Sequence, residues 1–570
     1  MTAREQLAQF AAGSKALPRL CREYKKERAT VHLKELVGGA LSFYAAAAAA
    51  KTGGVHVFVA EDRDAAAYLM NDFYNLLDEK QVYFFPSSYK RSVAYGAEDA
   101  QGVVQRTAAM NAVKGFTKGY LIVCTYPEAL AERVADAETL RRDTIAVKVG
   151  DSISIAVLED ALVDANFTRV DFVYEPGQYS VRGGIVDVFS FSESKPYRID
   201  FFGDEVDSIR RFNISSQLSA DKLDRVEIIP NLNAGDGAAK VSFVQFAGDA
   251  AAYWFYDADY VLRRVNDIRR KTLADMERPE EIDRLMTSRN ALLGDLANCR
   301  MLALRDNLPE RPATAAVEFD TAPQPKFNKN FEMLADDMIR NSLRGYTTYI
   351  LSENKVQVER LENIFHQIGR GQAVVRPLSV TLHEGFVDND LKLCLYTDHQ
   401  IFDRYQRYRI NGEIRRDEQM TVAELNQLRP GDYVVHIDHG VGRFDGLVKI
   451  NENGKAHEAI KLVYKDGDVL FVNVHSLHRI SRYKSGDGEP PKVYKLGNGA
   501  WQKLKNATKK AVKDISRELI ALYAKRKASK GFAFTPDSYL QHELEASFQW
   551  EDTPDQQTTV AAVKKDMESD

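Results

Sequence analysis

The hydrophobic and polar positions of the chain follow alternating helix-like and strand-like periods up to about residue 140. We expect helices at Ala40–Lys51 and Asp64–Leu77, and a further helix that begins at Pro127. Short apolar runs predict the intervening buried strands, which are Val55–Ala60, Val82–Phe85 and Leu121–Thr125. Strands that alternate with helices predict an α/β layer around a mostly parallel sheet.

Beyond this region the pattern changes twice. Short strands and turns begin near Gly150 and continue through Ile229-Pro230. Val241–Arg311 returns to strand and helix, and within it Met276–Arg300 has a strongly helical pattern. A second α/β unit follows from Phe331 to about Glu418. A length of 570 residues accommodates about four domains of this kind.

The stretch Thr421–Arg482 predicts a compact β-barrel. Asp466-Gly467 is a strong signal for a two-residue hairpin turn. The expected strands are Tyr433–His436, Val441–Ile450, Glu458–Tyr464 and Val469–Val474. After a connector rich in Gly and Pro, Trp501–Lys530 predicts one long helix with a single apolar stripe and ten Lys or Arg side chains. A charge run of this kind is most often a solvated face, and phosphate contact is the less common alternative.

The composition, with 44% apolar and 28% charged residues, is typical of a soluble globular chain. A formal net charge of −5 means that any nucleic-acid contact must come from local patches. The cysteines show no Cys-x-x-Cys pair, which argues against a zinc site or a disulfide framework and favours a reducing, cytoplasmic location; they are Cys21, Cys124, Cys299 and Cys394. We find no signal-peptide pattern and no long apolar span, and therefore expect no membrane insertion.

The end of the chain resembles the beginning of an ATP-dependent motor. Phe548 precedes Thr553-Pro554-Asp555-Gln556, in which a helix start is followed by an amide. The Gln556 amide has the donor and acceptor that pair with adenine, and Phe548 could stack on the base. Because no Gly-x-x-x-x-Gly-Lys-Ser/Thr occurs in the chain, we expect this adenine site to be incomplete and the sequence to be the front portion of a larger machine.

Three segments, in this order, resemble the bacterial transcription-repair coupling factor family (Mfd). Gly177–Phe189 with Pro196–Arg210 looks like the module that the family shares with the excision-repair protein UvrB. Pro430–Phe444 with Leu477–Tyr483 is similar to the family's RNA-polymerase-interacting domain. Thr553–Gln556 resembles the opening of the translocase motor. The resemblance covers essentially the whole chain and corresponds to the N-terminal half of the family.

The resemblance implies a multidomain α/β protein. It would contain a UvrB-like degenerate helicase-type α/β domain with an inserted α+β domain, a second α/β domain, a small Tudor-like β-barrel and a long linker helix. In chain order, the expected parts are the UvrB-like domain at 1–143, the UvrA-binding insertion at 144–229, the rest of the UvrB-like domain at 230–318, the additional α/β domain at 325–418, the barrel at 421–484, the linker helix at 498–531 and the truncated start of the translocase at 535–570.

In UvrB the first α/β domain carries a working phosphate loop. The corresponding stretch here, Leu36–Ser42, has no Lys and the wrong Gly spacing, so charge on the outer phosphates of a nucleotide would go uncompensated. We expect this chain to bind no cofactor and to be inactive as an ATPase. The resemblance implies that the intact protein is an ATP-dependent DNA translocase of helicase superfamily 2, and that it uses ATP and Mg²⁺.

The resemblance places the UvrA-docking surface at Arg182, Arg198 and Phe202. Arg198 and Phe202 are four residues apart in an extended run, so both can face one side of a strand. Arg guanidinium groups and aromatic rings often contribute much of the binding free energy of a protein interface. Alternatively, Arg182 pairs locally with Asp187 or Asp200 and Phe202 is part of the core.

The resemblance also places contact with the RNA polymerase β subunit at Ile460, Lys461 and Leu462. The hypothesis requires their strand to lie at an edge, where unpaired backbone groups can accept a partner strand. The alternative is an interior barrel strand, and the sequence alone does not decide which strand is the edge. His436 and His439 are three residues apart, but without a third ligand nearby we expect no metal site.

We therefore expect a monomeric recruitment scaffold for transcription-coupled nucleotide-excision repair. Its partners would be the RNA polymerase β subunit and UvrA, with double-stranded DNA as a partner of the intact protein and no membrane contact. The alternative is a UvrB-like repair protein that acts directly on damaged DNA. That alternative needs a phosphate loop and an aromatic hairpin, and we find neither pattern in the sequence.

Overall fold

The computed structural model forms two compact units, each of which is described by itself below. The first contains Met1–Leu140, Leu232–Gly412 and Phe534–Ser569, and the second contains Arg141–Asn231, Glu413–Ala533 and Asp570. The structure describes residues 2–89, 99–214, 218–232, 239–276, 278–353, 355–404, 428–436, 439–452, 455–473, 480–483, 491, 493, 495–496, 501, 503, 506–508, 522, 532–546, 548, 552 and 554–569. Together, these parts confirm the predicted multidomain α/β organisation.

A seven-stranded sheet, parallel throughout, forms the centre of the first unit. Its strand order is β17-β1-β16-β15-β2-β4-β3. The bounds are β1 Thr30–Lys34, β2 Gly54–Val59, β3 Val82–Phe84, β4 Tyr120–Thr125, β15 Ala252–Phe255, β16 Arg300–Ala303 and β17 Ala315–Glu318. The strands predicted in the first part of the chain are therefore confirmed, because their near-continuous apolar runs are buried on both faces of the sheet.

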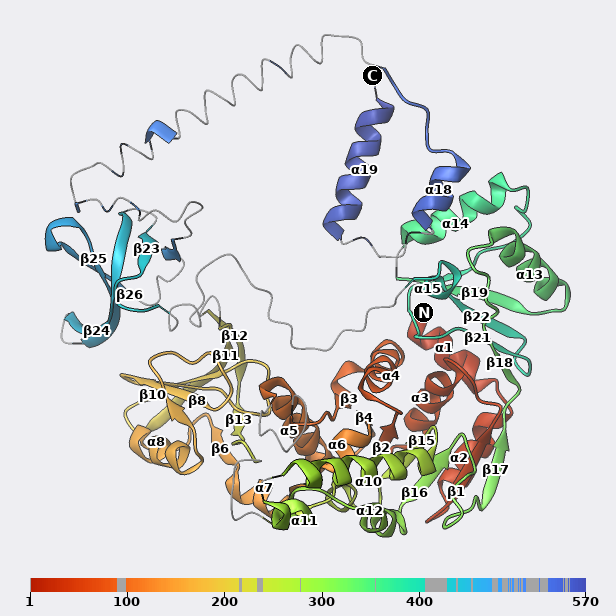
Figure 1. The fold of residues 1–570 in the computed structure, drawn as a ribbon, viewed down its shortest axis with the longest axis horizontal. Helices are drawn as coiled ribbons and strands as arrows, with labels where there is room; N and C mark the ends of the chain where they lie inside the picture. Colours follow the sequence, from red (N-terminus) through yellow and green to blue (C-terminus); the bar gives the residue numbers. More distant parts are fainter. Residues whose placement is uncertain are drawn as a thin grey trace. The chain divides into compact units, whose positions relative to one another are not determined.

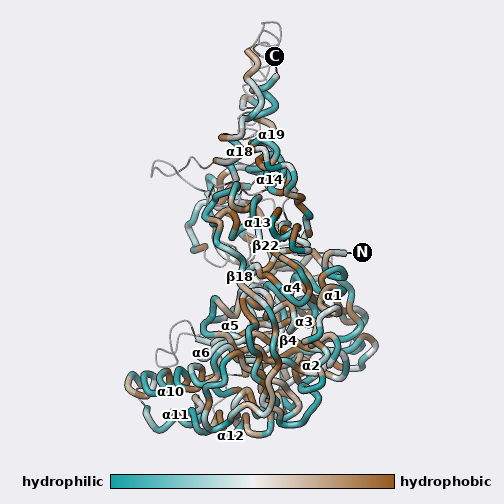
Figure 2. Tube along the Cα trace, turned by 90° about the vertical axis from the view of Figure 1, so that its right-hand side faces the viewer, coloured by the Kyte–Doolittle hydropathy of each residue, from teal (hydrophilic) through white to brown (hydrophobic). Residues whose placement is uncertain are grey.

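Helices cover both faces of this sheet, and Figure 1 shows β2, β4 and β15 between α3 and α4 on one side and α10 and α12 on the other. The small side chains of α3 are buried, which allows the helix to pack closely against the sheet and its neighbours. In Figure 2 hydrophobic residues are concentrated in the sheet region around β4, whereas α10 alternates between hydrophilic and hydrophobic residues. The helices are α1 Ala3–Ala12, α2 Ala16–Tyr24, α3 Ala40–Thr52, α4 Arg63–Leu76, α5 Ala100–Gly115, α6 Pro127–Ala131, α7 Ala137–Asp143, α9 Phe243–Ala247, α10 Ala258–Asp275, α11 Ile282–Leu285 and α12 Arg289–Leu296.

The strongly helical pattern of Met276–Arg300 corresponds to several short helical elements and not to one continuous helix. The long helix of this region is α10, which ends before it, and the stretch itself holds the 3₁₀ turn Pro279–Glu281, α11 and α12. Pro279 starts the 3₁₀ turn, Met286 is extended, and Ser288 caps α12 by accepting a hydrogen bond from the Ala291 amide. The regularly spaced apolar residues of this stretch therefore belong to two short helices, α11 and α12.

A second α/β domain of the same unit follows β17. Its five-stranded sheet has the order β18-β21-β22-β19-β20 and combines antiparallel and parallel pairs. The core packs α13 and α14 with aromatic and aliphatic side chains around Tyr396 and Phe331. The bounds are β18 Thr321–Pro323, α13 Phe331–Leu343, β19 Thr347–Leu351, α14 Lys355–Gln367, β20 Pro377–Leu378, β21 Phe386–Asp388, β22 Leu393–Thr397 and α15 Asp398–Ile401.

The second unit contains the inserted module, whose six-stranded sheet has the order β12-β11-β10-β9-β8-β7. One face of this sheet and α8 enclose a continuous apolar core that includes Leu158, Val186 and Ile199. The bounds are β6 Ile145–Lys148, α8 Ile155–Asp164, β7 Thr168–Arg169, β8 Gln178–Arg182, β9 Ile185–Val188, β10 Tyr197–Phe202, β11 Glu205–Phe212, β12 Ser219–Leu223 and β13 Arg225–Ile228.

The same unit contains a five-stranded antiparallel sheet with the order β26-β25-β24-β23-β27. A hairpin joins β25 to β26 at the predicted place, but its loop has three residues, Lys465–Gly467, and is closed by the Tyr464 amide, which donates to the Asp468 carbonyl oxygen. Both Asp466 and Gly467 have positive φ. The bounds are β23 Tyr433–His436, β24 Gly440–Glu452, β25 Lys455–Val463, β26 Val469–Asn473 and β27 Ile480–Arg482. The predicted linker helix Trp501–Lys530 lies largely outside the described residues.

In the first unit, the last helices are α18 Tyr539–Ala546 and α19 Pro554–Glu568. Glu545 of α18 forms ion pairs with Arg360 of α14 at 3.0 Å and with Lys564 of α19. These contacts connect α19 to α18, and α18 to α14 of the second α/β domain. Within the part of the chain that the structure describes, no helix is both long and apolar enough to cross a membrane.

A buried carboxyl joins the first sheet domain to the second α/β domain. Asp72 of α4 accepts hydrogen bonds from the His383 amide at 2.6 Å and from the Ser42 hydroxyl at 2.8 Å. The Ser42 hydroxyl also lies 3.0 Å from the Gly39 carbonyl oxygen, although it has a single proton to donate. Since Ser42 cannot donate to both oxygens at once, both contacts are satisfied together only if the Asp72 carboxyl is protonated and donates to Ser42, which then donates to Gly39. Burial raises the pKa of Asp72 to about 7, although the hydrogen bonds from Ser42 and from the His383 amide oppose the rise.

We expect Asp72→Asn to stabilise the chain against urea increasingly as the pH rises from 5 to 8. The pKa of Asp72 is raised from an ordinary 3.8, so the folded state holds the proton more tightly, and this stabilisation is lost as the pH rises through 7. An Asn amide keeps both hydrogen bonds and has no such dependence. The free-energy difference between the variant and the parent chain should grow by roughly 2–3 kcal/mol and then level off.

Urea unfolding at several pH values, followed by tryptophan fluorescence, measures this difference. Asp62→Asn is the matched control, because Asp62 caps the same helix through the Ala65 amide at an exposed position. A difference for Asp72→Asn that does not change with pH would contradict a carboxyl that is protonated in the folded state.

Candidate functional sites

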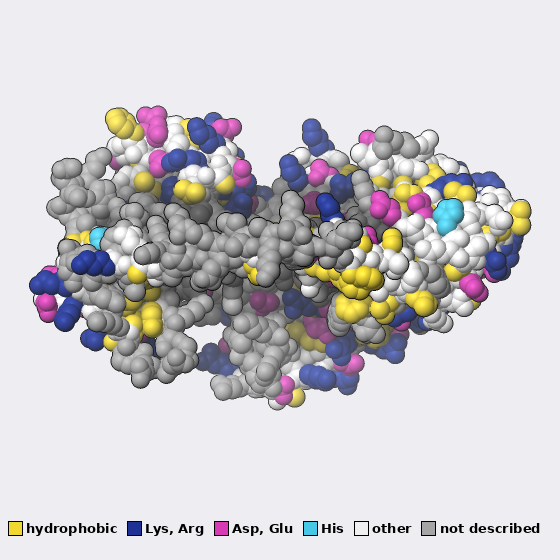
Figure 3. All heavy atoms as spheres, turned by 90° about the horizontal axis from the view of Figure 1, so that it is seen from above, with side chains coloured by type: hydrophobic (Ala, Val, Ile, Leu, Met, Phe, Trp, Pro, Cys, Tyr) yellow, Lys and Arg dark blue, Asp and Glu magenta, His cyan; other side chains and the backbone are white. Residues whose placement is uncertain are grey.

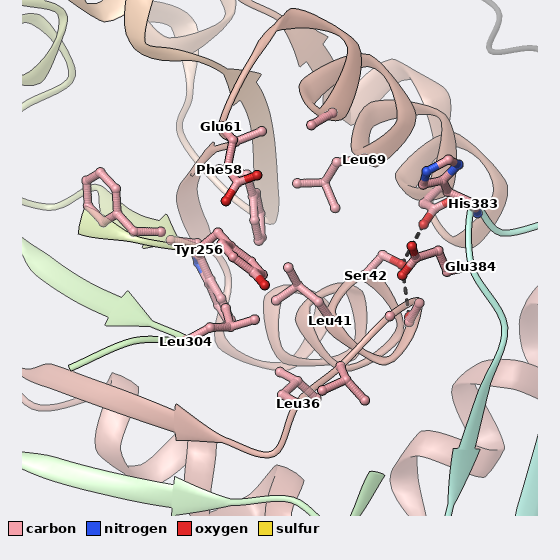
Figure 4. A pocket seen from close by; sticks show the side chains of 18 of the residues that line it. Leu36, Leu41, Ser42, Phe58, Glu61, Leu69, Tyr256, Leu304, His383 and Glu384 are labelled. Carbon is pink, nitrogen blue, oxygen red and sulfur yellow. Dashed lines mark hydrogen bonds between the residues drawn. The ribbon is translucent and has the colours of Figure 1, made fainter. Parts of the chain in front are cut away.

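A cavity of about 500 Å³ lies at the carboxyl ends of β1, β2, β15 and β16, where ligands of open α/β sheets usually bind. The turn Gly38-Gly39 and the first residues of α3 form one wall, and His383 and Glu384 of the second α/β domain contribute another. Figure 4 shows the Leu36, Leu41, Leu69, Phe58 and Tyr256 side chains around the space. This is the place where a phosphate loop would hold a nucleotide.

The residues present do not fit a nucleoside triphosphate. A Cβ atom on Gly39 would lie 2.0 Å from the Glu384 carbonyl oxygen, and one on Gly38 would lie 3.3 Å from a Glu384 carboxylate oxygen. The chain therefore packs its own backbone and an anionic side chain against the turn. Among the described residues that line the cavity, the basic side chains are Arg305 and His383, and Arg305 pairs with Asp257 at 3.3 Å.

In the inserted module, Asp187 holds two of the predicted docking residues. Arg198 donates hydrogen bonds to its two carboxylate oxygens at 2.7 and 2.8 Å, and Arg182 also pairs with Asp187. The Arg198 guanidinium lies over Phe212 at 4.4 Å, and Arg182 lies over Phe172 at 5.0 Å. Burial disfavours the charged form of Arg198, but its bonds to Asp187 outweigh this and the pKa of Arg198 is raised. The local pairing of Arg182 that the sequence left open is therefore present.

Phe202 differs from the two arginines in its exposure. It is the last residue of β10, immediately before the two-residue turn at Gly203, and its side chain is 83% exposed. Tyr197 and Ile199 of the same strand belong to the apolar core, whereas Arg198 and Phe202 lie outside it. The alternative that Phe202 is part of the core is therefore wrong. Its ring projects at the end of the sheet face that also carries Arg182 and Arg198.

The structure contradicts an edge position for the strand that carries Ile460, Lys461 and Leu462. β25 pairs with β24 on one side and with β26 on the other through all three residues or their neighbours. Ile460 and Leu462 are buried in the core of the sheet. The Lys461 side chain is on the outer face, where it pairs with Asp445 at 2.7 Å. β25 is an interior strand because it pairs with the strands that immediately precede and follow it in the sequence, β24 and β26.

The described sheet has two edge strands, β26 and β27. β26 pairs with β25 on one side, and no further strand follows it in the sheet order of the described residues. Phe471 lies opposite Lys461 in the register and is 47% exposed, and Val469 of the same face is also exposed. An exposed edge that carries apolar side chains is a surface to which a partner strand can pair.

The two residues predicted to hold adenine are both exposed. Phe548 lies between α18 and α19, and Gln556 is in the first turn of α19. The structure therefore supplies two solvent-accessible side chains at these positions.

The predicted histidine pair and the surface charges add no further site. The His436 and His439 rings are 4.8 Å apart, and no group of three His, Cys, Asp or Glu with metal-binding geometry occurs among the described residues. On the face shown in Figure 3, the described Lys and Arg side chains are interspersed with Asp and Glu. This mixture is consistent with the small net charge of the chain.

Two candidate positions were missed by the sequence patterns, Glu384 and Phe471. Asp187 was named as a possible partner of Arg182, but its pairing with Arg198 follows only from the strand register. Glu384 meets the Gly38-Gly39 turn from a distant part of the sequence. Phe471 had a usable signal, because Val469 and Phe471 alternate with Leu470 and Val472 and therefore place two large apolar residues on each face.

Comparison with known proteins agrees with this arrangement. Residues 145–233 match the UvrB interaction domain, and residues 428–484 match the CarD-like/TRCF RID domain. The chain is 26% identical to the transcription-repair-coupling factor of Bacillus subtilis (strain 168), in an alignment that covers 94% of the chain and 52% of the relative. It is 26% identical to that of Staphylococcus haemolyticus (strain JCSC1435) and 24% identical to that of Staphylococcus aureus (strain USA300), each over 88% of the chain and 49% of the relative.

The chain spans about half the length of the curated relatives it matches. The two matched domains occur in the order of the inserted module and the five-stranded sheet, and both docking surfaces described above lie within them. The chain is thus homologous, over about nine tenths of its length, to the N-terminal region of transcription-repair-coupling factors, with a UvrB interaction domain and a CarD-like RNA-polymerase-interacting domain.

Proposed function

We propose that this chain acts in transcription-coupled nucleotide-excision repair, as a scaffold that connects RNA polymerase to UvrA. The observation that carries the proposal is the presence of both a UvrB interaction domain and a TRCF RID domain in one chain. Each domain has an exposed surface suited to a protein partner. In the full-length protein, an ATP-dependent motor would push stalled polymerase along double-stranded DNA while this region recruits the repair proteins.

The surface proposed for UvrA combines Phe202 with the charged group formed by Arg182, Arg198 and Asp187. Two guanidinium groups share one carboxylate, so this group keeps a net positive charge. Asp187 orients Arg182 before a partner arrives, which lowers the side-chain entropy lost on binding. Arg198 is buried, and its proposed role is to position this group. The ring of Phe202 is the anchor that a complementary pocket would enclose.

The surface proposed for the RNA polymerase β subunit is the edge of β26. The main-chain groups of an edge strand can pair with a strand of the partner, and the side chains that alternate along it confer specificity. Phe471 and Val469 supply apolar contact area on the outer face, and Lys461 lies beside Phe471. Lys461 is the one residue of the predicted polymerase-binding set whose side chain reaches that face.

The nucleotide contacts of the family are proposed to lie elsewhere than in the first α/β domain. Phe548 and Gln556 remain candidates for adenine recognition in the full-length motor, where ATP and Mg²⁺ would be held by further residues. The alternative function is that of a UvrB-like protein that acts on damaged DNA by itself. The cavity does not support it, because Glu384 packs against the Gly38-Gly39 turn where a phosphate would lie.

Phe202→Ala is expected to weaken binding to UvrA by about tenfold or more, because truncation of an exposed aromatic anchor commonly costs more than about 1 kcal/mol. The thermal stability of the chain should not change, since the side chain contributes little to the core. Leu218→Ala is the control, because Leu218 is 70% exposed in the same module. Surface plasmon resonance with immobilised UvrA measures the affinity.

Arg198→Met distinguishes a positioning role from direct contact. Removal of Arg198 leaves Asp187 buried with less compensation, so we expect the module to lose stability as well as UvrA affinity. If Arg198→Met left stability unchanged while Phe202→Ala left affinity unchanged, the proposed UvrA surface would be wrong.

Phe471→Ala is expected to lower affinity for the N-terminal part of the polymerase β subunit by about tenfold without a loss of thermal stability. Ile460→Arg should also abolish binding, but through a different cause, because it places a charge in the core of the sheet and unfolds it. Affinity and circular dichroism are measured on the same samples. Arg429→Ala, an exposed change near β23, is the control, and normal binding by a folded Phe471→Ala variant would exclude the β26 edge.

A further inference from the structure

The filled phosphate turn leaves a cavity of about 500 Å³ that the proposed function does not use. Its size lies within the range of small-molecule sites, roughly 300–1,000 Å³. Its walls are mostly aliphatic and aromatic: Leu33, Leu36, Leu41, Phe58, Leu69, Tyr68, Tyr256 and Leu304. Figure 4 shows the Tyr256 ring extending across the space toward Leu41. Such walls favour a ligand with an apolar ring.

The charges around the cavity are mainly negative. Glu35, Glu61 and Glu384 line it and are exposed to solvent, and Figure 4 shows Glu61 and Glu384 on opposite sides of the space. The Arg305 guanidinium lies over the Tyr256 ring at 5.3 Å and pairs with Asp257. His383 stacks on Tyr68, with ring centroids 3.8 Å apart.

The partial positive charge at the N-terminus of α3 does not make the cavity favourable for anions. The first turn of a helix favours an anion, and the Glu384 carboxylate already lies beside that turn. A concave site with apolar walls concentrates the field of its charges, so the carboxylates at the rim attract cations and repel phosphates. Aromatic faces add a further attraction for a desolvated cation.

We propose that this cavity binds a small organic cation that carries an apolar ring, such as an aromatic amine or amidine. The ring would lie among Leu41, Leu69 and Tyr256, and the cationic group would face Glu61 or Glu384. The same residues that exclude a nucleotide thereby select a ligand of opposite charge. This inference concerns a site that neither docking surface includes.

Isothermal titration calorimetry of the whole chain with benzamidine, benzamide and benzoate tests the proposal. The three probes share one ring and differ in charge, which is positive, neutral and negative. We expect benzamidine to bind at least about fivefold more tightly than benzamide, since a cation gains both the carboxylates and the aromatic faces. Benzoate should show no binding at the same concentrations.

Two types of variant locate the binding. Glu384→Gln and Glu61→Gln keep the shape of the site, and at least one of them should reduce benzamidine affinity by about threefold or more without affecting benzamide. Leu69→Trp should fill the cavity and abolish binding of both probes. Glu280→Gln, an exposed change in a distant 3₁₀ turn, is the matched control, and circular dichroism confirms that each variant is folded.

Equal affinity for benzamidine and benzamide would overturn the charge selection, and retention of benzamidine by a folded Leu69→Trp variant would overturn the location. The proposal also fails if no probe binds, or if ADP displaces benzamidine from the cavity. UvrA and polymerase binding are measured in parallel and test the proposed docking surfaces separately. A failure of the cavity proposal can therefore be told apart from a failure of the proposed function.

Discussion

The contact between the Gly38-Gly39 turn and Glu384 determines what the first α/β domain can do. Because a backbone oxygen of Glu384 occupies the space that a Cβ on Gly39 would need, the two segments are in direct main-chain contact. The Glu384 carboxylate beside the turn places a negative charge where a helix N-terminus would otherwise favour a phosphate. Asp72 secures the same segment through the His383 amide. A fold associated with nucleotide binding is thereby used as a structural support for the second α/β domain.

The two proposed docking surfaces share one arrangement, in which a buried framework holds a few exposed side chains. In the inserted module, charges are buried in pairs around Asp187, and Phe202 remains exposed at the end of the strand. In the five-stranded sheet, β25 is enclosed by its neighbours, and β26 presents the edge. In both cases an ordered and largely satisfied framework holds a small number of accessible apolar side chains. This is the arrangement expected of surfaces that bind protein partners.

Local patterns were sufficient for most of the elements that surround the sites. β2, β3 and β4 of the first sheet were predictable because they are short apolar runs between helices, and the position of the β25–β26 turn was predictable from Asp466-Gly467. Met276–Arg300 was predicted as strongly helical, but apolar spacing alone does not show the interruption between α11 and α12 at Met286–Ser288. The position of Glu384 against the Gly38-Gly39 turn depends on contact between distant segments, which no single stretch of sequence reveals. The pairing of Arg182 with Asp187 is local, and it was one of the alternatives that the sequence offered.

The central claim is that one chain connects RNA polymerase to UvrA. The most direct test is a bridging assay in which the immobilised N-terminal part of the polymerase β subunit captures labelled UvrA in the presence of the whole chain. The account predicts that UvrA is retained only when the chain is added, and that retention is lost when either domain carries a folded surface variant. A chain that binds the β subunit and leaves UvrA entirely in solution would contradict the claim.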